Sequence, residues 1–137
     1  MGICSTTYGD LVCRGCKRFA HEIDQWNGYA DDQRRLVWER LYKLREGAVL
    51  AHVRIEDETL LSARAASLRV PEFEALSPAN LAYEVIRRSL REPDLTAFGL
   101  AARRSGADTQ ALYDEVEGEL YRRAVAQFER DFRVPAR

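Results

Sequence analysis

The chain of 137 residues has few of the residue types on which most catalytic sites depend. It contains two histidines, three cysteines and one methionine, with no His-Glu-x-x-His pair, Ser/His/Asp grouping or glycine-rich phosphate loop. No apolar run approaches the roughly 20 residues that span a bilayer, and no basic stretch followed by an apolar segment marks a secretory signal. These absences predict a non-enzymatic protein of the reducing cytoplasm with no membrane partner.

An excess of either charge is also missing. Lys and Arg number 21 against 22 Asp and Glu, a net charge of -1, so no global field attracts nucleic acid or an anionic membrane. Hydrophobic residues make up 46% of the chain and charged residues 31%, which is typical of a globular protein and not of a disordered one. A chain of this length buries roughly two-thirds of its unfolded surface, so it needs neither a disulfide nor a metal to fold.

What the sequence does contain is helical periodicity and strong capping signals. A long helix begins at Asp31 with an apolar seam that reaches Ala51, and Ser77-Pro78 is a typical helix start. No strand-length alternation is present. The sequence therefore predicts an all-α protein: a cysteine knuckle with a short helix over 1–29, then a domain of about five helices over 30–137. The other predicted helices span about 19–26, 57–68, 94–105 and 108–132.

All three cysteines lie near the N-terminus, in the stretch MGICSTTYGDLVCRGC. Cys13 and Cys16 form a Cys-x-x-Cys turn, which brings two sulfurs to the same side of a tetrahedral ion. We expect Gly15 to take a positive φ in this turn, and Gly9 to lie in a chain reversal that returns Cys4 to the pair. The predicted metal ligands are Cys4, Cys13 and Cys16, and the cofactor is zinc or an iron–sulfur cluster, with the choice left open.

Two other interpretations of the cysteines have less support. A thioredoxin-like disulfide centre requires a strand-to-helix junction in a βαβ pattern, which this sequence lacks. Three unrelated thiols in an irregular segment would rarely gather within 13 residues around a Cys-x-x-Cys turn. Neighbouring Arg14, Lys17 and Arg18 add positive charge, which favours the thiolate form of nearby cysteines.

The fourth position of a tetrahedral site has one candidate nearby, His21, five residues after Cys16. On a helix that turns Phe19, Ile23 and Trp26 toward the body of the protein, His21 lies about 200° from Phe19. We therefore predict that His21 points outward and is not a ligand. His52, alone on the long helix, is predicted to be structural or solvated.

The N-terminal pattern resembles a bacterial family of short cysteine-rich domains of unknown function that are predicted to be iron–sulfur proteins. The matching residues lie within about 1–40 and comprise Gly2, Cys4, Leu11, Cys13, Arg14, Gly15, Cys16, Glu22, Ile23, Trp26, Arg34 and Arg35. The resemblance implies a metal site and a further cysteine immediately before Met1. We therefore expect an in-frame cysteine codon upstream, and we expect the chain without that cysteine to bind metal weakly or to stay empty.

Two other ligand classes are compatible with the sequence. Arg14, Lys17 and Arg18, together with Tyr8 and Phe19, could contact phosphates and stack on bases, although charge compensation of thiolates explains the same basic residues. The first six residues also fit the loose N-myristoylation pattern, with a cysteine available for palmitoylation. Trp26 and Tyr29 are predicted to pack the knuckle onto the helical body. Because Trp and Tyr are also typical interface anchors, the preferred partner is a protein.

Overall fold

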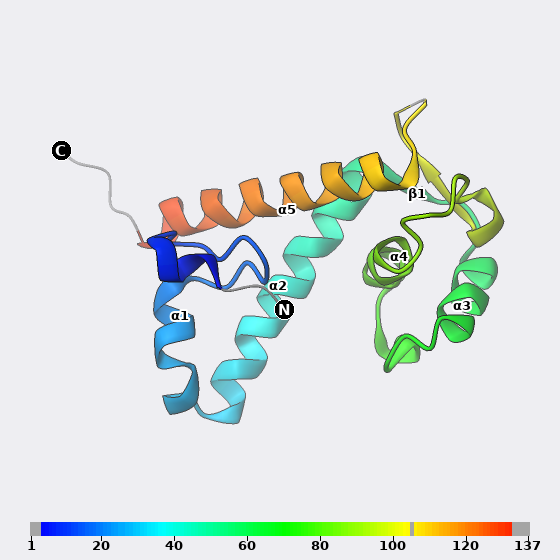
Figure 1. Cartoon of the computed structure of the whole chain (residues 1–137). Coiled ribbons are helices and arrows are strands. Elements are labelled where there is room, and N and C mark those ends of the chain that lie inside the picture. The colour runs from blue at the N-terminus through cyan, green and yellow to red at the C-terminus, as the bar shows by residue number, and fades with distance from the viewer. Residues whose placement is uncertain (1–3, 105, 133–137) are drawn as a thin grey trace. The chain divides into compact units, whose positions relative to one another are not determined.

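A computed structural model of the chain describes residues 4–104 and 106–132 (Figure 1). Helices account for 66% of the described residues, and the predicted all-α class is confirmed. No helix in these two ranges has the length and apolar character needed to cross a bilayer. The five α-helices of the described residues are α1 (Ala20–Gln25), α2 (Asp31–His52), α3 (Glu58–Ser67), α4 (Pro78–Arg87) and α5 (Thr109–Phe132).

The helix starts follow from the side chains that cap them. The Asp57 carboxylate accepts hydrogen bonds from the backbone N–H groups of Thr59 at 2.9 Å and Leu60 at 3.1 Å, which fixes the start of α3. Ser77 caps α4 in the same way, accepting from Asn80 N–H at 3.3 Å. Pro78 occupies the first position of α4, where its missing N–H costs nothing. Both predicted starts are confirmed.

The segment from 94 to 105 is not the helix that the sequence predicted. It contains a 3₁₀ turn, η4 (Thr96–Phe98), and a short strand, β2 (Leu100–Ala102), which pairs antiparallel with β1 (Val53–Ile55). Gly99 between them has a φ of 74°, the left-handed conformation that stops a helix. Strands of three residues are too short to show an alternation of apolar and polar side chains, so the hydrophobic pattern of the sequence did not predict them. Ser105, the predicted end of that helix, lies outside the described residues.

The chain divides into two compact units. The first comprises residues 1–44 and 120–137, and the second comprises residues 45–119. The divisions fall within α2 and within α5. The domain boundary expected after residue 29 lies inside the first unit.

The core of the first unit joins the N-terminal loop to the last helix. Buried Val12 and Phe19 face each other in an isolated antiparallel bridge and form one cluster with Ala124 and Phe128 of α5. The Phe19 and Phe128 rings meet edge to face with centroids 5.2 Å apart, a favourable aromatic geometry. The Tyr121 hydroxyl donates to the Val12 carbonyl at 3.5 Å. The cysteine loop is thus held by α5.

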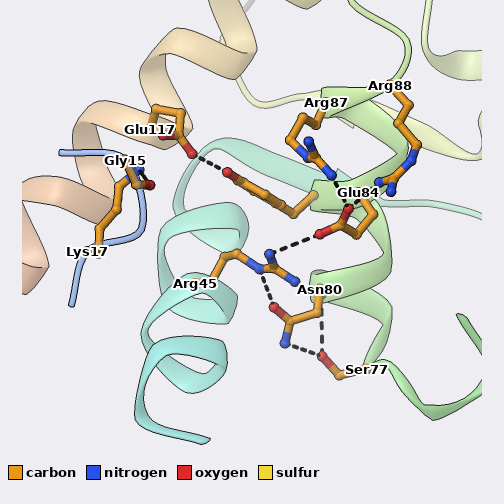
Figure 2. A network of polar contacts seen from close by, with 10 residues as sticks. Gly15, Lys17, Arg45, Ser77, Asn80, Glu84, Arg87, Arg88 and Glu117 are labelled. Atoms are coloured by element: carbon orange, nitrogen blue, oxygen red, sulfur yellow. Dashed lines mark hydrogen bonds and ion pairs between the residues drawn. The ribbon is translucent and has the colours of Figure 1, made fainter. Parts of the chain in front are cut away.

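The second unit is organised around α4, most of whose residues are buried. Figure 2 shows the polar network along this helix. Arg45 donates from Nε to Asn80 Oδ1 at 2.6 Å and from a terminal nitrogen to Glu84 at 3.1 Å. Arg87 and Arg88 bond the other oxygen of the same carboxylate. Glu84 therefore receives three guanidinium groups while only 15% of its side chain is exposed.

This network makes the second unit sensitive to acid. Burial raises the pKa of Glu84, but hydrogen bonds from Arg88 and Arg87 and the charge of Arg45 outweigh it and hold the pKa below 4.5. The ionised carboxylate thus stabilises the fold fully above the unfolded pKa, and that contribution is lost as the pH falls through the folded pKa. We expect Glu84→Gln to lower the free energy of unfolding by about 2 kcal/mol at pH 7.

The measurement is urea unfolding of both proteins from pH 7 to pH 3. The difference between wild type and Glu84→Gln should shrink below about pH 4.5, where protonation removes the same interactions from the wild type. Exposed Glu74 offers the control, since Glu74→Gln should change stability by less than about 0.5 kcal/mol. A difference between wild type and Glu84→Gln that is constant across this pH range would contradict the prediction.

Candidate functional site

The Cys-x-x-Cys turn lies at the tip of a short hairpin-like loop. Cys13 N–H donates to the Arg18 carbonyl at 2.9 Å, and Lys17 N–H donates to the Cys13 carbonyl at the same distance. Further from the tip, Ala20 N–H donates to the Leu11 carbonyl at 2.9 Å. These backbone bonds close the loop, so the position of the turn does not depend on its own side chains.

The positive φ of this turn belongs to Lys17, and the prediction that Gly15 would carry it is wrong. Lys17 has a φ of 65°, whereas Gly15 is not among the positive-φ glycines of the described residues. Lys17 is the residue at which the chain leaves the turn, just before Arg18, whose carbonyl accepts the Cys13 N–H. The Lys17 side chain is only 2% exposed, and its ammonium donates to the Gly15 carbonyl at 3.0 Å. A buried lysine in this conformation costs about 1–2 kcal/mol relative to an ordinary backbone.

Cys4 folds back onto the turn as predicted. A 3₁₀ turn, η1 (Ser5–Tyr8), is ended by Gly9 with a φ of 99°, and the chain then reverses. The Ser5 hydroxyl accepts from Arg14 N–H at 2.8 Å, tying the two arms together. As a result the Cys4 and Cys13 sulfurs are 3.5 Å apart, within hydrogen-bond distance, and the Cys4 sulfur also lies 3.0 Å from the Thr6 hydroxyl oxygen.

Cys13 lies in an environment that favours its thiolate. Its side chain is 4% exposed, and this burial raises its pKa. Hydrogen bonds from the backbone of Cys16, the Cys4 thiol, and the backbones of Gly15 and Ser5 outweigh the burial and bring the pKa to about 6, from an ordinary 9.0. Backbone N–H groups and a thiol therefore surround the Cys13 sulfur and favour its negatively charged form.

Cys16 has a different partner. Its sulfur accepts a hydrogen bond from Arg18 Nε at 3.2 Å. The guanidinium carbon of Arg18 also lies 4.7 Å from the centroid of the Trp26 ring and 5.8 Å from that of Trp38. Arg18 therefore links the thiol to a pair of tryptophans.

The structure brings two of the three predicted ligands into contact. Cys4 and Cys13 touch, while Cys16 is engaged by arginine. In residues 4–104 and 106–132, no three His, Cys, Asp or Glu side chains lie together in a way that could hold a metal ion. Metal binding at these cysteines remains a prediction.

Among the basic residues beside the cysteines, Arg18 contacts a sulfur directly, that of Cys16. Arg14 forms an ion pair with Asp10 at 3.3 Å and stacks over the Tyr121 ring at 4.7 Å. The predicted charge compensation by Arg14 is therefore indirect. Its guanidinium instead attaches the outer side of the loop to α5.

Sequence reasoning missed the structural role of Glu22. Its carboxylate is buried, accepts from Phe19 N–H at 2.8 Å, and forms an ion pair with Arg40. The Arg40 guanidinium in turn lies 4.1 Å from the Phe19 ring centroid. The spacing of Phe19 and Glu22 could have predicted this role, because a Glu three residues after a helix N-cap commonly accepts from the N-cap N–H.

The outward orientation predicted for His21 is wrong. Its ring lies 5.8 Å from the Phe19 centroid and 4.8 Å from that of Phe132. The second ring, Phe132, lies at the end of α5, and a helical wheel of α1 cannot show a contact with another helix. His21 is thus half-buried between two phenyl rings.

We expect His21→Ala to leave metal affinity unchanged within about twofold, because the His21 ring packs on phenyl rings. The loss of this aromatic packing should lower stability by about 1 kcal/mol. Competition titration with a chromogenic zinc chelator measures the first quantity, and thermal unfolding the second. His21→Phe is the matched control, since it restores an aromatic ring without a metal-binding nitrogen. A large loss of affinity in both variants would make His21 a ligand.

The other histidine is also better connected than its isolation in the sequence suggested. His52 Nδ1 lies 3.5 Å from the Glu115 carboxylate, and Nε2 lies 3.2 Å from that of Glu119. Both glutamates belong to α5, one helical turn apart. The structural role predicted for His52 is therefore a specific one, the bridging of two carboxylates within the second unit.

The comparisons with known proteins concern the N-terminal third of the chain. Residues 1–45 match the model of a family described as "Protein of unknown function (DUF1289)". No curated protein and no solved structure matches the chain. The matched residues contain the cysteine loop, α1 and the part of α2 that belongs to the first unit. The sequence resemblance to an uncharacterised family is thus confirmed over this segment, without support for its iron–sulfur label.

Proposed function

We propose that the N-terminal loop is a non-enzymatic metal-binding knuckle that uses Cys4, Cys13 and Cys16. The observation that carries this proposal is the 3.5 Å contact between the Cys4 and Cys13 sulfurs, reached from separate arms of the loop. A tetrahedral zinc with Zn–S bonds of about 2.3 Å separates two thiolates by about 3.8 Å. Two corners of such a site therefore already have suitable spacing.

The third corner requires the Cys16 sulfur to move toward the other two, because the three sulfurs are not grouped around a metal position in the described residues. The Cys16 sulfur accepts from Arg18 at 3.2 Å, and a metal-bound thiolate can keep one such hydrogen bond. The fourth ligand is water, an added small ligand, or a cysteine preceding Met1. A bound zinc would crosslink the two arms of the loop, whereas an iron–sulfur cluster would add one-electron redox chemistry.

We further propose that the knuckle acts through a protein partner in the reducing cytoplasm. The surface that supports this is aromatic: Trp38 is 40% exposed and Tyr42 is 42% exposed, beside Trp26 and Arg18. Aromatic residues and arginine are enriched at protein interfaces. Nearby basic residues have acidic partners, as in the ion pairs of Arg34 with Asp31 and Arg35 with Asp32, which leaves little free charge for phosphates. A protein partner is therefore favoured over nucleic acid.

The deciding experiment is metal analysis of protein purified under anaerobic conditions. One zinc per chain in a colourless protein would support a zinc knuckle, and a brown protein with iron and sulfide in equal amounts would support a cluster carrier. Protein without metal that also fails to take up zinc or cobalt at micromolar concentration would refute metal binding. Cobalt adds a direct readout, since thiolate coordination gives an intense charge-transfer band.

A further inference from the structure

The structure assigns a second chemistry to the same loop: we propose that Cys4 and Cys13, rather than the Cys-x-x-Cys pair, form a reversible disulfide when the metal-free protein meets a small disulfide oxidant. The inference rests on the sulfur contact itself. Cys4 and Cys13 sulfurs lie 3.5 Å apart, while a disulfide is about 2.05 Å long. The sulfurs therefore have about 1.5 Å left to close, and the Arg14 N–H to Ser5 hydroxyl bond at 2.8 Å already holds the two arms together beside them.

The expected alternative, a bond between Cys13 and Cys16, is opposed by their surroundings. Cys16 donates its backbone N–H toward the Cys13 sulfur, while its own sulfur is held by Arg18 Nε at 3.2 Å. Forming that bond would require breaking the Arg18 contact and turning the Cys16 side chain. Cys4 already lies 3.5 Å from the Cys13 sulfur, and it would give up only a 3.0 Å contact with the Thr6 hydroxyl on its own arm.

The exposure of the two sulfurs sets the order of the steps. Cys4 is half-buried, whereas Cys13 is 4% exposed, so an oxidant reaches Cys4 first. With oxidised glutathione, the Cys4 thiol gives up its proton as its sulfur attacks one glutathione sulfur, a mixed disulfide forms, and the released glutathione takes up that proton and leaves as a thiol. The Cys13 thiolate then attacks the Cys4 sulfur and releases the second glutathione. Two cysteine thiols lose two electrons and two protons, and the glutathione disulfide gains them.

The consequence for the proposed metal site is competition. A disulfide uses the same two sulfurs that would bind zinc, so oxidation would release the metal, and bound zinc would protect the sulfurs. This part of the inference rests on the proposed function. The disulfide itself does not, because it is formed and measured in protein stripped of metal.

Trypsin distinguishes the possible bonds because of where the basic residues lie. Cleavage after Arg14 and after Lys17 yields one peptide of residues 1–14 with both Cys4 and Cys13, and one of residues 15–17 with Cys16. A Cys4–Cys13 bond stays inside the first peptide and lowers its mass by two hydrogens. Either bond to Cys16 joins the two peptides into one heavier species.

The test treats chelator-stripped full-length protein with oxidised glutathione, blocks the remaining thiols, and digests without reductant. We expect the peptide of residues 1–14 with an internal disulfide and Cys16 alkylated. Cys16→Ser should oxidise within about twofold of the wild-type rate, while Cys4→Ser should oxidise at least tenfold more slowly. Joined peptides, a disulfide-linked dimer, no disulfide, or an unchanged rate in Cys4→Ser would each overturn the proposal.

A parallel reaction with zinc keeps the two proposals separate. Slower oxidation in zinc supports both the disulfide and the metal site. An internal disulfide that forms equally fast with zinc leaves the disulfide standing and counts against the metal site. If the reduced protein takes up zinc but forms no internal disulfide, the metal site is supported and the disulfide proposal is wrong.

Discussion

The double variant Cys13→Ser with Cys16→Ser is expected to lose metal binding and keep its helices. Removing two thiolates of three leaves one, which cannot hold a tetrahedral ion, so affinity should fall by more than the roughly 10–100-fold seen when a residue that merely orients a ligand is removed. Helicity should persist, because the apolar cluster of the first unit is built from hydrocarbon side chains such as Phe19 and Phe128 and contains no cysteine. Far-ultraviolet circular dichroism and zinc competition titration measure the two effects.

The matched comparison is wild type treated with a chelator, which should have the same circular dichroism spectrum as the double variant and an equally cooperative melt. Cys13 is nearly buried, so its replacement by Ser should lower stability by only about 1–2 kcal/mol. Complete unfolding on chelation would mean that the metal nucleates the fold, as in small zinc fingers.

Replacing Gly99 is expected to disrupt the second unit more than the loss of the Glu84 carboxylate does. A Cβ at this position would lie 2.1 Å from the Asp57 carbonyl oxygen, and the φ of 74° disfavours any side chain. The Gly99 carbonyl also accepts the backbone N–H groups of Glu56 at 2.7 Å and Asp57 at 3.1 Å. We expect Gly99→Ala to lower the free energy of unfolding by at least about 3 kcal/mol, from left-handed strain and steric clash together.

Gly106 provides the control for this prediction. Its φ is 82°, close to that of Gly99, but among the described residues no atom beyond its chain neighbours lies within 4 Å of a Cβ built there. Gly106→Ala should therefore cost only the backbone strain, about 1–2 kcal/mol. Urea unfolding of both variants isolates the clash with Asp57 as the difference between them. Equal losses in the two variants would mean that the chain moves to accommodate the new methyl group.

The parts of the fold that the sequence predicted well are those controlled by neighbouring residues. Ser77-Pro78 and Asp57 mark helix starts through hydrogen bonds to residues two or three positions away, and a local pattern contains that information. The strand pair was missed because each strand has three residues and its partner lies about 50 positions away. The predicted helix from Asp94 failed because the left-handed Gly99 and the pairing of β2 overrode its periodicity.

The candidate site divides in the same way. The return of Cys4 was predictable, because the Gly9 turn is local. The partner of Cys16 was less so, since Arg18 is close in sequence but is held by Trp26 and Trp38 through tertiary contacts. The orientation of His21 depends on Phe132, more than 100 residues away, and no helical wheel could include it.

The divided first unit has a consequence for how the protein is made. Val12 and Phe19 emerge from the ribosome early, but Ala124 and Phe128, with which they pack, are synthesised roughly 100 residues later. At about 5–20 residues per second, the nascent cysteines spend several seconds without the apolar support that closes their loop. Whichever reaction the sulfurs undergo, capture of an ion or oxidation, it reaches its final geometry only after the second unit has been translated. A longer second unit would lengthen this interval, and a shorter one would shorten it.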